Sequence, residues 1–204
     1  MHIEFLVEEV SAEAALKVLL PKIIQSRATW TIHPFAGKPD LLGKLPTRLK
    51  GYFAWLPVDW RILVLIDEDR EDCLELKIQM EGAAAAANLV TPKTRQGNQR
   101  IQVVNRIVVE ELEAWFFGDA DALRSAFPGV PTTLEKQSKY RNSDAVKGGT
   151  WEQLERVLQR AGYYSQGLAK IEAARKIALQ MEPSRNRSES FAQFRGAIET
   201  LLTG

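Results

Sequence analysis

The stretch "RILVLIDED" (residues 61–69) decides the fold class of this 204-residue chain. The apolar residues Leu63, Val64, Leu65 and Ile66 within it predict a strand that is buried on both faces, as strands of parallel sheets are. Asp67, Glu68 and Asp69 follow at once, so like charges crowd together where the strand ends. Ligands of open parallel sheets bind beyond the carboxyl ends of the strands. The stretch therefore predicts an α/β fold with a functional site at this strand end.

Three further strands and their connecting helices surround this stretch. The sequence predicts strands at 3–8, 28–34 and 101–109, and helices at 11–25, 45–55, 71–89 and 110–118. Strand and helix alternate, which predicts a mostly parallel sheet with right-handed crossovers and flanking helices. After residue 118 only helices are predicted, at 119–126, 151–161, 166–181 and 188–202. We expect one folding unit, with an α/β core over 1–118 and a helical extension over 119–204 packed on it.

Composition and charge narrow the class of protein. Hydrophobic residues make up 45% and charged residues 26% of the chain, which is ordinary for a globular protein. The net charge of +1 gives no global attraction to nucleic acid or membranes. Residues 1–90 carry 10 Lys/Arg and 13 Asp/Glu (net −3), and residues 91–204 carry 17 and 13 (net +4). This asymmetry indicates either a metal site facing a groove for a polyanion or solvated faces of unequal composition.

Targeting signals and cysteine usage exclude further classes. No signal peptide is visible, and no apolar run approaches the roughly 18 residues that a membrane span requires. The single cysteine, Cys73, excludes an internal disulfide and a zinc site built from several thiolates. We therefore expect a cytoplasmic protein without membrane contacts.

Carboxylates follow two further strands of the predicted sheet. Glu8 ends the first strand, and Glu110 and Glu113 follow the fourth. Because parallel strands end at the same edge, we expect Glu8, Asp67 and Asp69 to open into one crevice. Mg²⁺ and Mn²⁺ prefer such oxygen ligands, and an ion would offset the repulsion between the acids. The sequence predicts a metal site of Glu8, Asp67 and Asp69, with Glu113 helping to hold a second ion.

The remaining acids of these loops have a simpler explanation. Glu71, Asp72 and Glu111 lie where predicted helices begin, and acids there interact favourably with the helix dipole. We interpret them as helix N-terminal residues rather than metal ligands.

Three side chains outside the acidic loops have two interpretations each. Lys38, in "GKP" (37–39), is predicted to steady a phosphate near the acids, or is a lone loop lysine. Arg106 lies on the inner face of the fourth strand, so we expect a buried ion pair with Glu110 or Glu113, or a role in stabilising charge on the phosphate. His33 is either structural or a general base.

Residues 128–150 are predicted to form an irregular basic loop. Such a long loop is usually functional or disordered. Lys139, Arg141 and Lys147, with Tyr140 among them, suit contact with a phosphate backbone, and the alternative is a mobile surface loop. Lys170 is a further predicted nucleic-acid contact or charge stabiliser.

Two short motifs resemble a known catalytic domain. "FLVEEVSAEAAL" (5–16) and "LVLIDED" (63–69) resemble the first and second motifs of the TOPRIM domain of topoisomerases, primases and overcoming-lysogenization-defect nucleases. The resemblance implies a Rossmann-like TOPRIM fold and metal-dependent chemistry on phosphodiester bonds. The TOPRIM pattern usually has Gly after its Glu, whereas Glu9 follows Glu8 here. The backbone freedom of Gly is lost, which leaves open whether Glu8 or Glu9 is the first-motif acid.

Longer segments resemble a bacterial family known only as a domain of unknown function (family 4276). They are "HPFAGKPDLLGKLPTRLKGY" (33–52), "VVNRIVVEELEAWFFGD" (103–119), "KGGTWEQLE" (147–155) and "GLAKIEAA" (167–174). Members of that family look like the nuclease partner of an ATPase in phage-defence gene pairs. The resemblance therefore implies a nuclease that acts with an ATPase.

Two functions remain open. The first is a Mg²⁺- or Mn²⁺-dependent nuclease acting on DNA or RNA, with Glu8, Asp67, Asp69 and Lys38 as its catalytic residues. The second is a non-catalytic subunit that docks on an ATPase through its C-terminal helices and uses the acidic crevice as a structural or regulatory ion site.

Overall fold

The computed structural model describes residues 1–69 and 71–204. One sheet contains the four strands β1 (His2–Val7), β2 (Thr29–Pro34), β3 (Trp60–Asp67) and β4 (Val103–Val108), in the order β2-β1-β3-β4. Every pairing in it is parallel. The predicted parallel α/β fold is confirmed. The strand that ends at Asp67 lies inside the sheet, next to the strand that precedes Glu8.

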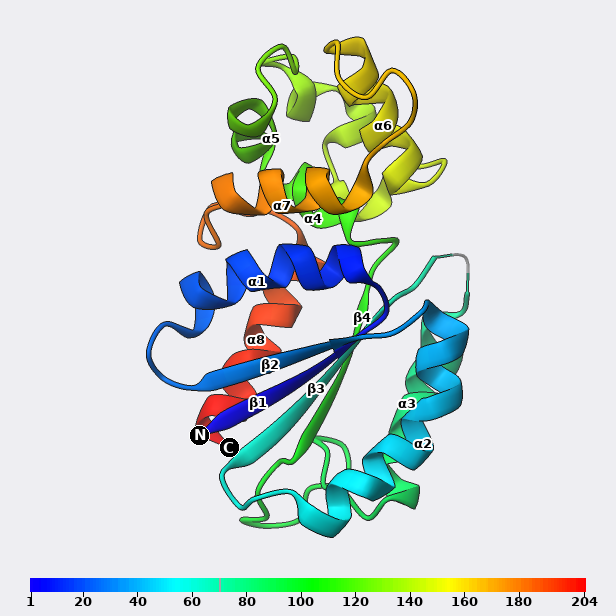
Figure 1. The fold of residues 1–204 in the computed structure, drawn as a ribbon, viewed down its shortest axis with the longest axis vertical. Coiled ribbons are helices and arrows are strands. Elements are labelled where there is room, and N and C mark those ends of the chain that lie inside the picture. The colour runs from blue at the N-terminus through cyan, green and yellow to red at the C-terminus, as the bar shows by residue number, and fades with distance from the viewer. Residues whose placement is uncertain (70) are drawn as a thin grey trace.

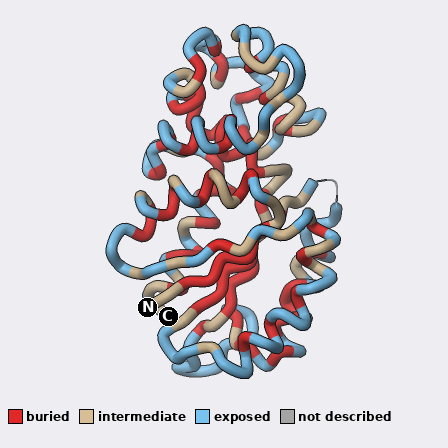
Figure 2. Tube along the Cα trace, in the orientation of Figure 1, coloured by how far each residue is buried: buried red, intermediate tan, exposed pale blue. Residues whose placement is uncertain are grey.

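Helices cover both faces of the sheet (Figure 1). Helices α1 (Val10–Ile24) and α8 (Glu189–Thr203) lie on one face, and α2 (Lys38–Trp55) and α3 (Cys73–Ala86) on the other. A hydrophobic core lies on each face of the sheet, and alternate residues of β3 pack into one or the other. Leu63 packs with α1 and α8, and Val64 packs with α2 and α3. This double burial, visible along the strands in Figure 2, explains why residues 62–66 of β3 are all apolar.

Helix α2 begins seven residues before its predicted start at 45, at Lys38. Gly37 precedes it with a φ of 91°, a conformation that suits glycine. Pro39 lies in the first turn, where a missing N–H costs no helical hydrogen bond. Buried Leu41, Leu45 and Leu49 keep one face of the helix on the sheet. The early start places Lys38 on a helix rather than in the predicted loop.

The rest of the chain is helical. It contains α4 (Glu113–Gly118), α5 (Ala120–Ala126), α6 (Thr150–Arg160) and α7 (Lys170–Gln180) before α8 returns to the sheet. Helix α7 packs against α1, which joins this part to the core.

Residues 128–150 are largely irregular, as the sequence suggested, but they contain three short helical turns. The three 3-10 helices are Leu134–Lys136, Ser138–Tyr140 and Ser143–Ala145, which together hold nine of the 23 residues. Tyr140 is buried, and its ring stacks on Phe117 with 5.0 Å between centroids. Because the tyrosine anchors the segment to α4, it is not exposed for a nucleic acid.

The longest described helix, α2, has 18 residues and carries five charged side chains. No helix in the described ranges is long and apolar enough to cross a membrane.

Candidate active site

The ends of β1 and β3 are tied together by an acidic side chain. Val7 lies opposite Leu65 in the parallel register, so both strands end at the same edge of the sheet. Glu8 Oε2 accepts a hydrogen bond from the backbone N–H of Asp67 at 3.0 Å. Glu9 instead precedes α1, and its carboxylate accepts a hydrogen bond from the Ser11 hydroxyl. The geometry thus brings Glu8, rather than Glu9, into direct contact with the second-motif strand.

The charge of these acids is poorly compensated. Burial, followed by the neighbouring carboxylates Glu8 and Glu113, raises the pKa of Asp67 well above its ordinary value. Burial also raises the pKa of Glu8, although the Asp67 N–H and the Lys38 ammonium oppose that effect. The carboxylates therefore repel one another, and the edge favours protonation or a bound cation.

Lys38 places an ammonium group beside this edge. Its side chain is only 6% exposed, and Nζ lies 2.7 Å from Asp69 Oδ2 and 3.0 Å from Glu71 Oε1. The ammonium also donates to the carbonyl oxygen of Glu68 at 3.1 Å. Burial lowers the pKa of Lys38, but the two acids outweigh it and the net pKa is raised. Lys38 is therefore charged, and it holds the loop after β3 against the start of α2.

Glu113 brings a third carboxylate to the site. It is the first residue of α4 and is only 3% exposed. Burial raises its pKa to about 7, although Lys170 opposes the rise. Lys170, at the start of α7, lies over the Trp151 ring with Nζ 4.6 Å from the centroid. The charge of Glu113 adds to the raised pKa of Asp67, and the charge of Lys170 opposes the raised pKa of Glu113.

The two loops that carry these acids are interlocked. Asp69 N–H donates to the Glu110 carbonyl at 2.8 Å, and Glu110 N–H donates to Glu68 Oε2 at 3.2 Å. Asp69 and Glu110 both adopt left-handed backbone conformations, with φ of 53° and 61°. Such conformations cost about 1 kcal/mol or more for residues other than glycine and cluster at functional sites. Both residues lie where the loop after β3 contacts the loop after β4.

The donor atoms at this edge fit Mg²⁺ or Mn²⁺ in kind, because all are carboxylate oxygens. The negative charges of Glu8 and Glu113 repel that of Asp67 and add to the burial that raises its pKa. A bound cation would relieve this repulsion. Their positions fit less well: in the described part of the chain, no three acidic, histidine or cysteine side chains form a ready-made metal site. Asp69 is engaged by Lys38. An ion at Glu8, Asp67 and Glu113 would therefore require side-chain movement.

The sequence profile of one family matches residues 7–201 of the chain, and its description is "Domain of unknown function (DUF4276)". The chain belongs to this family. Neither a curated protein nor a solved structure matches it. The family resemblance carried by the four longer segments is thereby confirmed.

In this DUF4276 protein, Arg106 does not have its predicted partners. Among the described residues it forms no ion pair with Glu110 or Glu113, and its buried Nε has no hydrogen-bond partner. Burial lowers the pKa of Arg106, and Glu81 of α3 is the acid that opposes this. The reason is local: the loop turn at Glu110 and the burial of Glu113 in α4 keep both acids at the strand end.

Of the three acids interpreted as helix N-terminal residues, Asp72 alone caps the helix that follows it. Asp72 Oδ1 accepts from the N–H groups of Leu74 and Glu75 at the start of α3. Glu111 accepts from the Trp151 N–H at 2.8 Å and so caps α6 instead of its own helix. Glu71 binds Lys38 instead of capping α3.

The predicted nucleic-acid contacts lie on the helical part of this DUF4276 chain. Lys139, Arg141 and Lys147 are all exposed. Burial, with the charges of Arg156 and Arg160, lowers the pKa of Lys139. The two arginines of α6 thus extend the basic surface. They were not predicted as contacts, because the prediction rested on the composition of the preceding segment alone.

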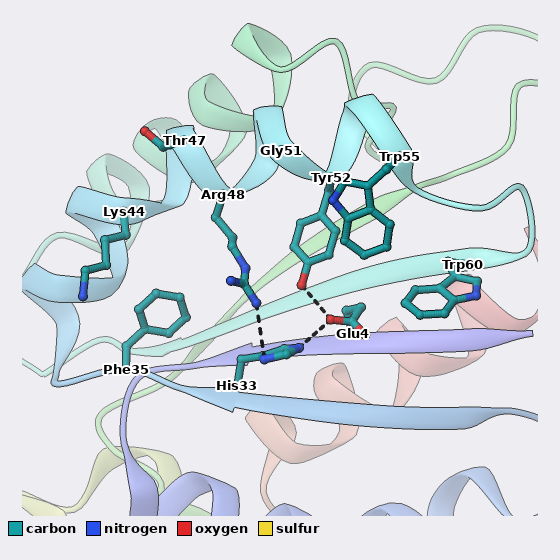
Figure 3. A pocket seen from close by; sticks show the side chains of 10 residues that line it. All are labelled: Glu4, His33, Phe35, Lys44, Thr47, Arg48, Gly51, Tyr52, Trp55 and Trp60. Carbon is teal, nitrogen blue, oxygen red and sulfur yellow. Dashed lines mark hydrogen bonds and ion pairs between the residues drawn. The ribbon is translucent and has the colours of Figure 1, made fainter.

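A second polar cluster was not predicted from the sequence. Glu4, in the middle of β1, is buried and accepts hydrogen bonds from the Tyr52 hydroxyl at 2.6 Å and His33 Nε2 at 2.5 Å (Figure 3). His33 therefore faces Glu4, not the acidic crevice. The available signal was a glutamate inside the otherwise apolar strand "IEFLV" (3–7).

Proposed function

We propose that this protein is a TOPRIM-like nuclease that hydrolyses phosphodiester bonds of DNA or RNA with Mg²⁺ or Mn²⁺. The observation that carries the proposal is the contact between Glu8 and the Asp67 N–H across two adjacent parallel strand ends. It matches the order of acids implied by the TOPRIM resemblance, and the buried ammonium of Lys38 lies beside it. Carboxylates and a cation are the groups that phosphoryl transfer requires.

Each residue has a distinct role in this proposal. Glu8, Asp67 and Glu113 would hold the ion, which supplies an activated water and neutralises charge on the phosphate. Asp69 positions Lys38 through their 2.7 Å ion pair. Lys38 would exchange Glu71 or the Glu68 carbonyl for a non-bridging oxygen of the phosphate and stabilise the charge that develops there. The partial protonation of Glu113 near pH 7 is consistent with a ligand that loses its proton when an ion binds.

Part of the substrate backbone is bound by cations of the helical part of the chain. The charge of Lys170 acts on Glu113, and the charges of Arg156 and Arg160 in α6 act on Lys139. We propose that these cations bind the phosphate backbone without reading its sequence.

An ATPase partner forms part of the proposal, because the family resemblance implies one. Helix α7 exposes Ile171 and Leu179, with exposed fractions of 52% and 60%. Exposed apolar side chains of this size suit a protein contact. Cleavage assays with and without the ATPase distinguish an autonomous nuclease from one that depends on its partner.

The proposal is tested by incubating purified protein with supercoiled plasmid and RNA in Mn²⁺, Mg²⁺ or EDTA. We expect metal-dependent cleavage that Asp67→Asn and Glu8→Gln abolish. Glu75→Gln, an exposed acid of α3, is the matched control and should cleave normally. Cleavage that persists in Asp67→Asn would show a contaminating nuclease or a different site. Binding of an ion without any cleavage, alone or with the ATPase, would favour the structural ion site.

A further inference from the structure

A second hollow lies on the open edge of the sheet, between α2 and strands β1 and β2. Its volume is about 630 Å³, large enough for a small ligand. Its floor is the hydrogen-bonded chain from Arg48 through His33 and Glu4 to Tyr52 (Figure 3). Arg48 Nη2 lies 3.3 Å from His33 Nδ1, so the arginine donates into this chain.

Aromatic rings form one end of the hollow. Trp55 and Trp60 lie edge to face with 5.8 Å between centroids, and Trp55 lies 5.3 Å from Tyr52 (Figure 3). Trp55 is 56% exposed although it belongs to a core-packed helix. Trp55 is thus an exposed flat surface beside a polar floor, an arrangement that suits a planar ring with hydrogen-bonding edges.

The charges on the rim favour an anion. Arg48 and Lys44 are exposed on the α2 side of the hollow. Lys44 pairs with Asp40, but Arg48 has no ion pair among the described residues. The opposing charge of Glu4 is buried in the floor and accepts hydrogen bonds from three side chains, those of His2, His33 and Tyr52. A planar ring and an anionic group together describe a nucleotide.

The hollow continues toward the acidic crevice. A neighbouring cavity of about 950 Å³ shares His33 and Arg48 with it and reaches Glu9 and Gly37. Gly37 N–H donates to the carbonyl oxygen of Glu8 at 3.0 Å. The two cavities therefore form one groove along α2 that ends beside the first-motif acid.

We infer that this groove binds a single-stranded segment of nucleic acid, with one base stacked on Trp55 and the adjacent phosphates on Arg48 and Lys44. A single strand fits better than a duplex because duplex bases are stacked on one another and hide the faces that an aromatic side chain needs. That the bound strand is also the strand that is cut rests on the proposed function. Binding itself does not.

The test measures binding without cleavage. Fluorescence anisotropy in EDTA follows the full-length protein with a labelled single strand of about ten nucleotides, within the size of known single-strand sites. Trp55→Ala should weaken binding roughly 5- to 150-fold, the usual effect of losing one stacked base. Phe53→Ala is the matched control, because Phe53 is 55% exposed on the same helix but does not line the groove.

A charge variant tests the phosphate contact independently. Arg48→Gln should weaken binding and lower its salt dependence, whereas Lys50→Gln, an exposed lysine of α2 outside the groove, should change little. Equal affinity for Trp55→Ala, Phe53→Ala and wild type would overturn the inference. It would also be overturned if a mononucleotide competed as well as the oligonucleotide, or if duplex bound as tightly as single strand.

Binding and cleavage can fail separately. If binding depends on Trp55 but Mn²⁺ never supports cleavage, the inference that the groove binds a single strand stands and the nuclease proposal fails. If metal-dependent cleavage occurs and Trp55→Ala leaves the affinity for single strands unchanged, the nuclease proposal stands and the groove inference fails.

Discussion

The carboxylate of Glu8 accepts the backbone N–H of Asp67 at 3.0 Å, which joins the ends of two adjacent parallel strands. The hydrogen bond holds the two acids close together although the charge of Glu8 adds to the burial that raises the pKa of Asp67. A fold that keeps repelling carboxylates in this position loses stability for it. The loss becomes understandable if a cation binds there.

Asp67→Asn should stabilise the metal-free protein. The pKa of Asp67 is raised, so its charged form is disfavoured in the folded state and removing that charge relieves repulsion. Each kcal/mol gained would raise the melting temperature by about 2–4 °C in a protein of this size. Melting curves in EDTA at pH 7.5 measure the effect, and Glu75→Gln should leave the melting temperature unchanged.

The same variant should lose the response to metal. An ion that binds only the folded wild type adds about 2.7 kcal/mol of stability at a hundredfold excess over its dissociation constant. Without the Asp67 carboxylate, Mn²⁺ should produce little or no rise in melting temperature. A full Mn²⁺ shift in Asp67→Asn would show that Asp67 is not a ligand.

Glu113 should make stability fall between about pH 4.5 and pH 7. Its pKa is about 7 in the folded protein and 4.5 ordinarily, so in this range the folded state binds more protons than the unfolded state. Stability contributed by the neutral acid is complete below about pH 4.5 and is lost as pH rises through 7, at a cost of about 3 kcal/mol.

The pH prediction is checked by urea unfolding of wild type and Glu113→Gln at pH 5 and pH 8. The neutral glutamine does not titrate, so its stability should vary less over this range, by up to about 3 kcal/mol. Parallel curves for the two proteins would contradict the raised pKa of Glu113.

The sheet and its acidic edge could be predicted because their signals are local. An apolar run that ends in Asp67 indicates a doubly buried strand, and alternation with helices indicates parallel pairing. These two facts are enough to bring Glu8 and Asp67 to one edge. The start of α2 was harder to predict, because Pro39 is a helix breaker in most positions and is tolerated only in the first turn.

Side-chain partners could not be predicted in the same way. Lys38 binds acids some thirty positions away, Asp69 and Glu71, and Glu111 caps a helix that starts at Thr150. Such partners depend on how loops approach in space, which sequence spacing does not determine. For the same reason, the prediction that Arg106 pairs with Glu110 or Glu113 was wrong.

The basic surface should contribute to the salt dependence of nucleic-acid binding. Lys139, Arg141 and Lys147 are exposed and lie together in one segment before α6. Replacing all three with Ala should reduce the slope of log affinity against log salt by about 2–3 if each contacts a phosphate, for DNA and RNA of any sequence. Binding titrations at several salt concentrations measure this slope.

The matched control replaces Lys50, Lys93 and Arg95, which are three exposed cations outside this segment. It removes the same charge and should keep the wild-type slope. Equal slopes for the two triple variants and wild type would leave Lys139, Arg141 and Lys147 without a role in binding.

Lys38→Met should separate metal binding from catalysis. The ammonium of Lys38 pairs with Asp69 at 2.7 Å, and it lowers the pKa of Glu8. Its loss removes the cation that competes with an ion at this edge, so the Mn²⁺-induced rise in melting temperature should be retained or increased. The free energy of unfolding of the metal-free variant should fall by about 1–2 kcal/mol, since the partners Asp69 and Glu71 are about half exposed and solvent screens them.

Cleavage by Lys38→Met should nevertheless fall by about 10²-fold or more if Lys38 stabilises charge on the phosphate. Lys50→Met, at an exposed position of the same helix, should change none of these three quantities. Normal cleavage by Lys38→Met would assign Lys38 to the structure of the loop alone, whereas loss of both cleavage and the Mn²⁺ shift would mean that Lys38 holds the acids in place for the ion.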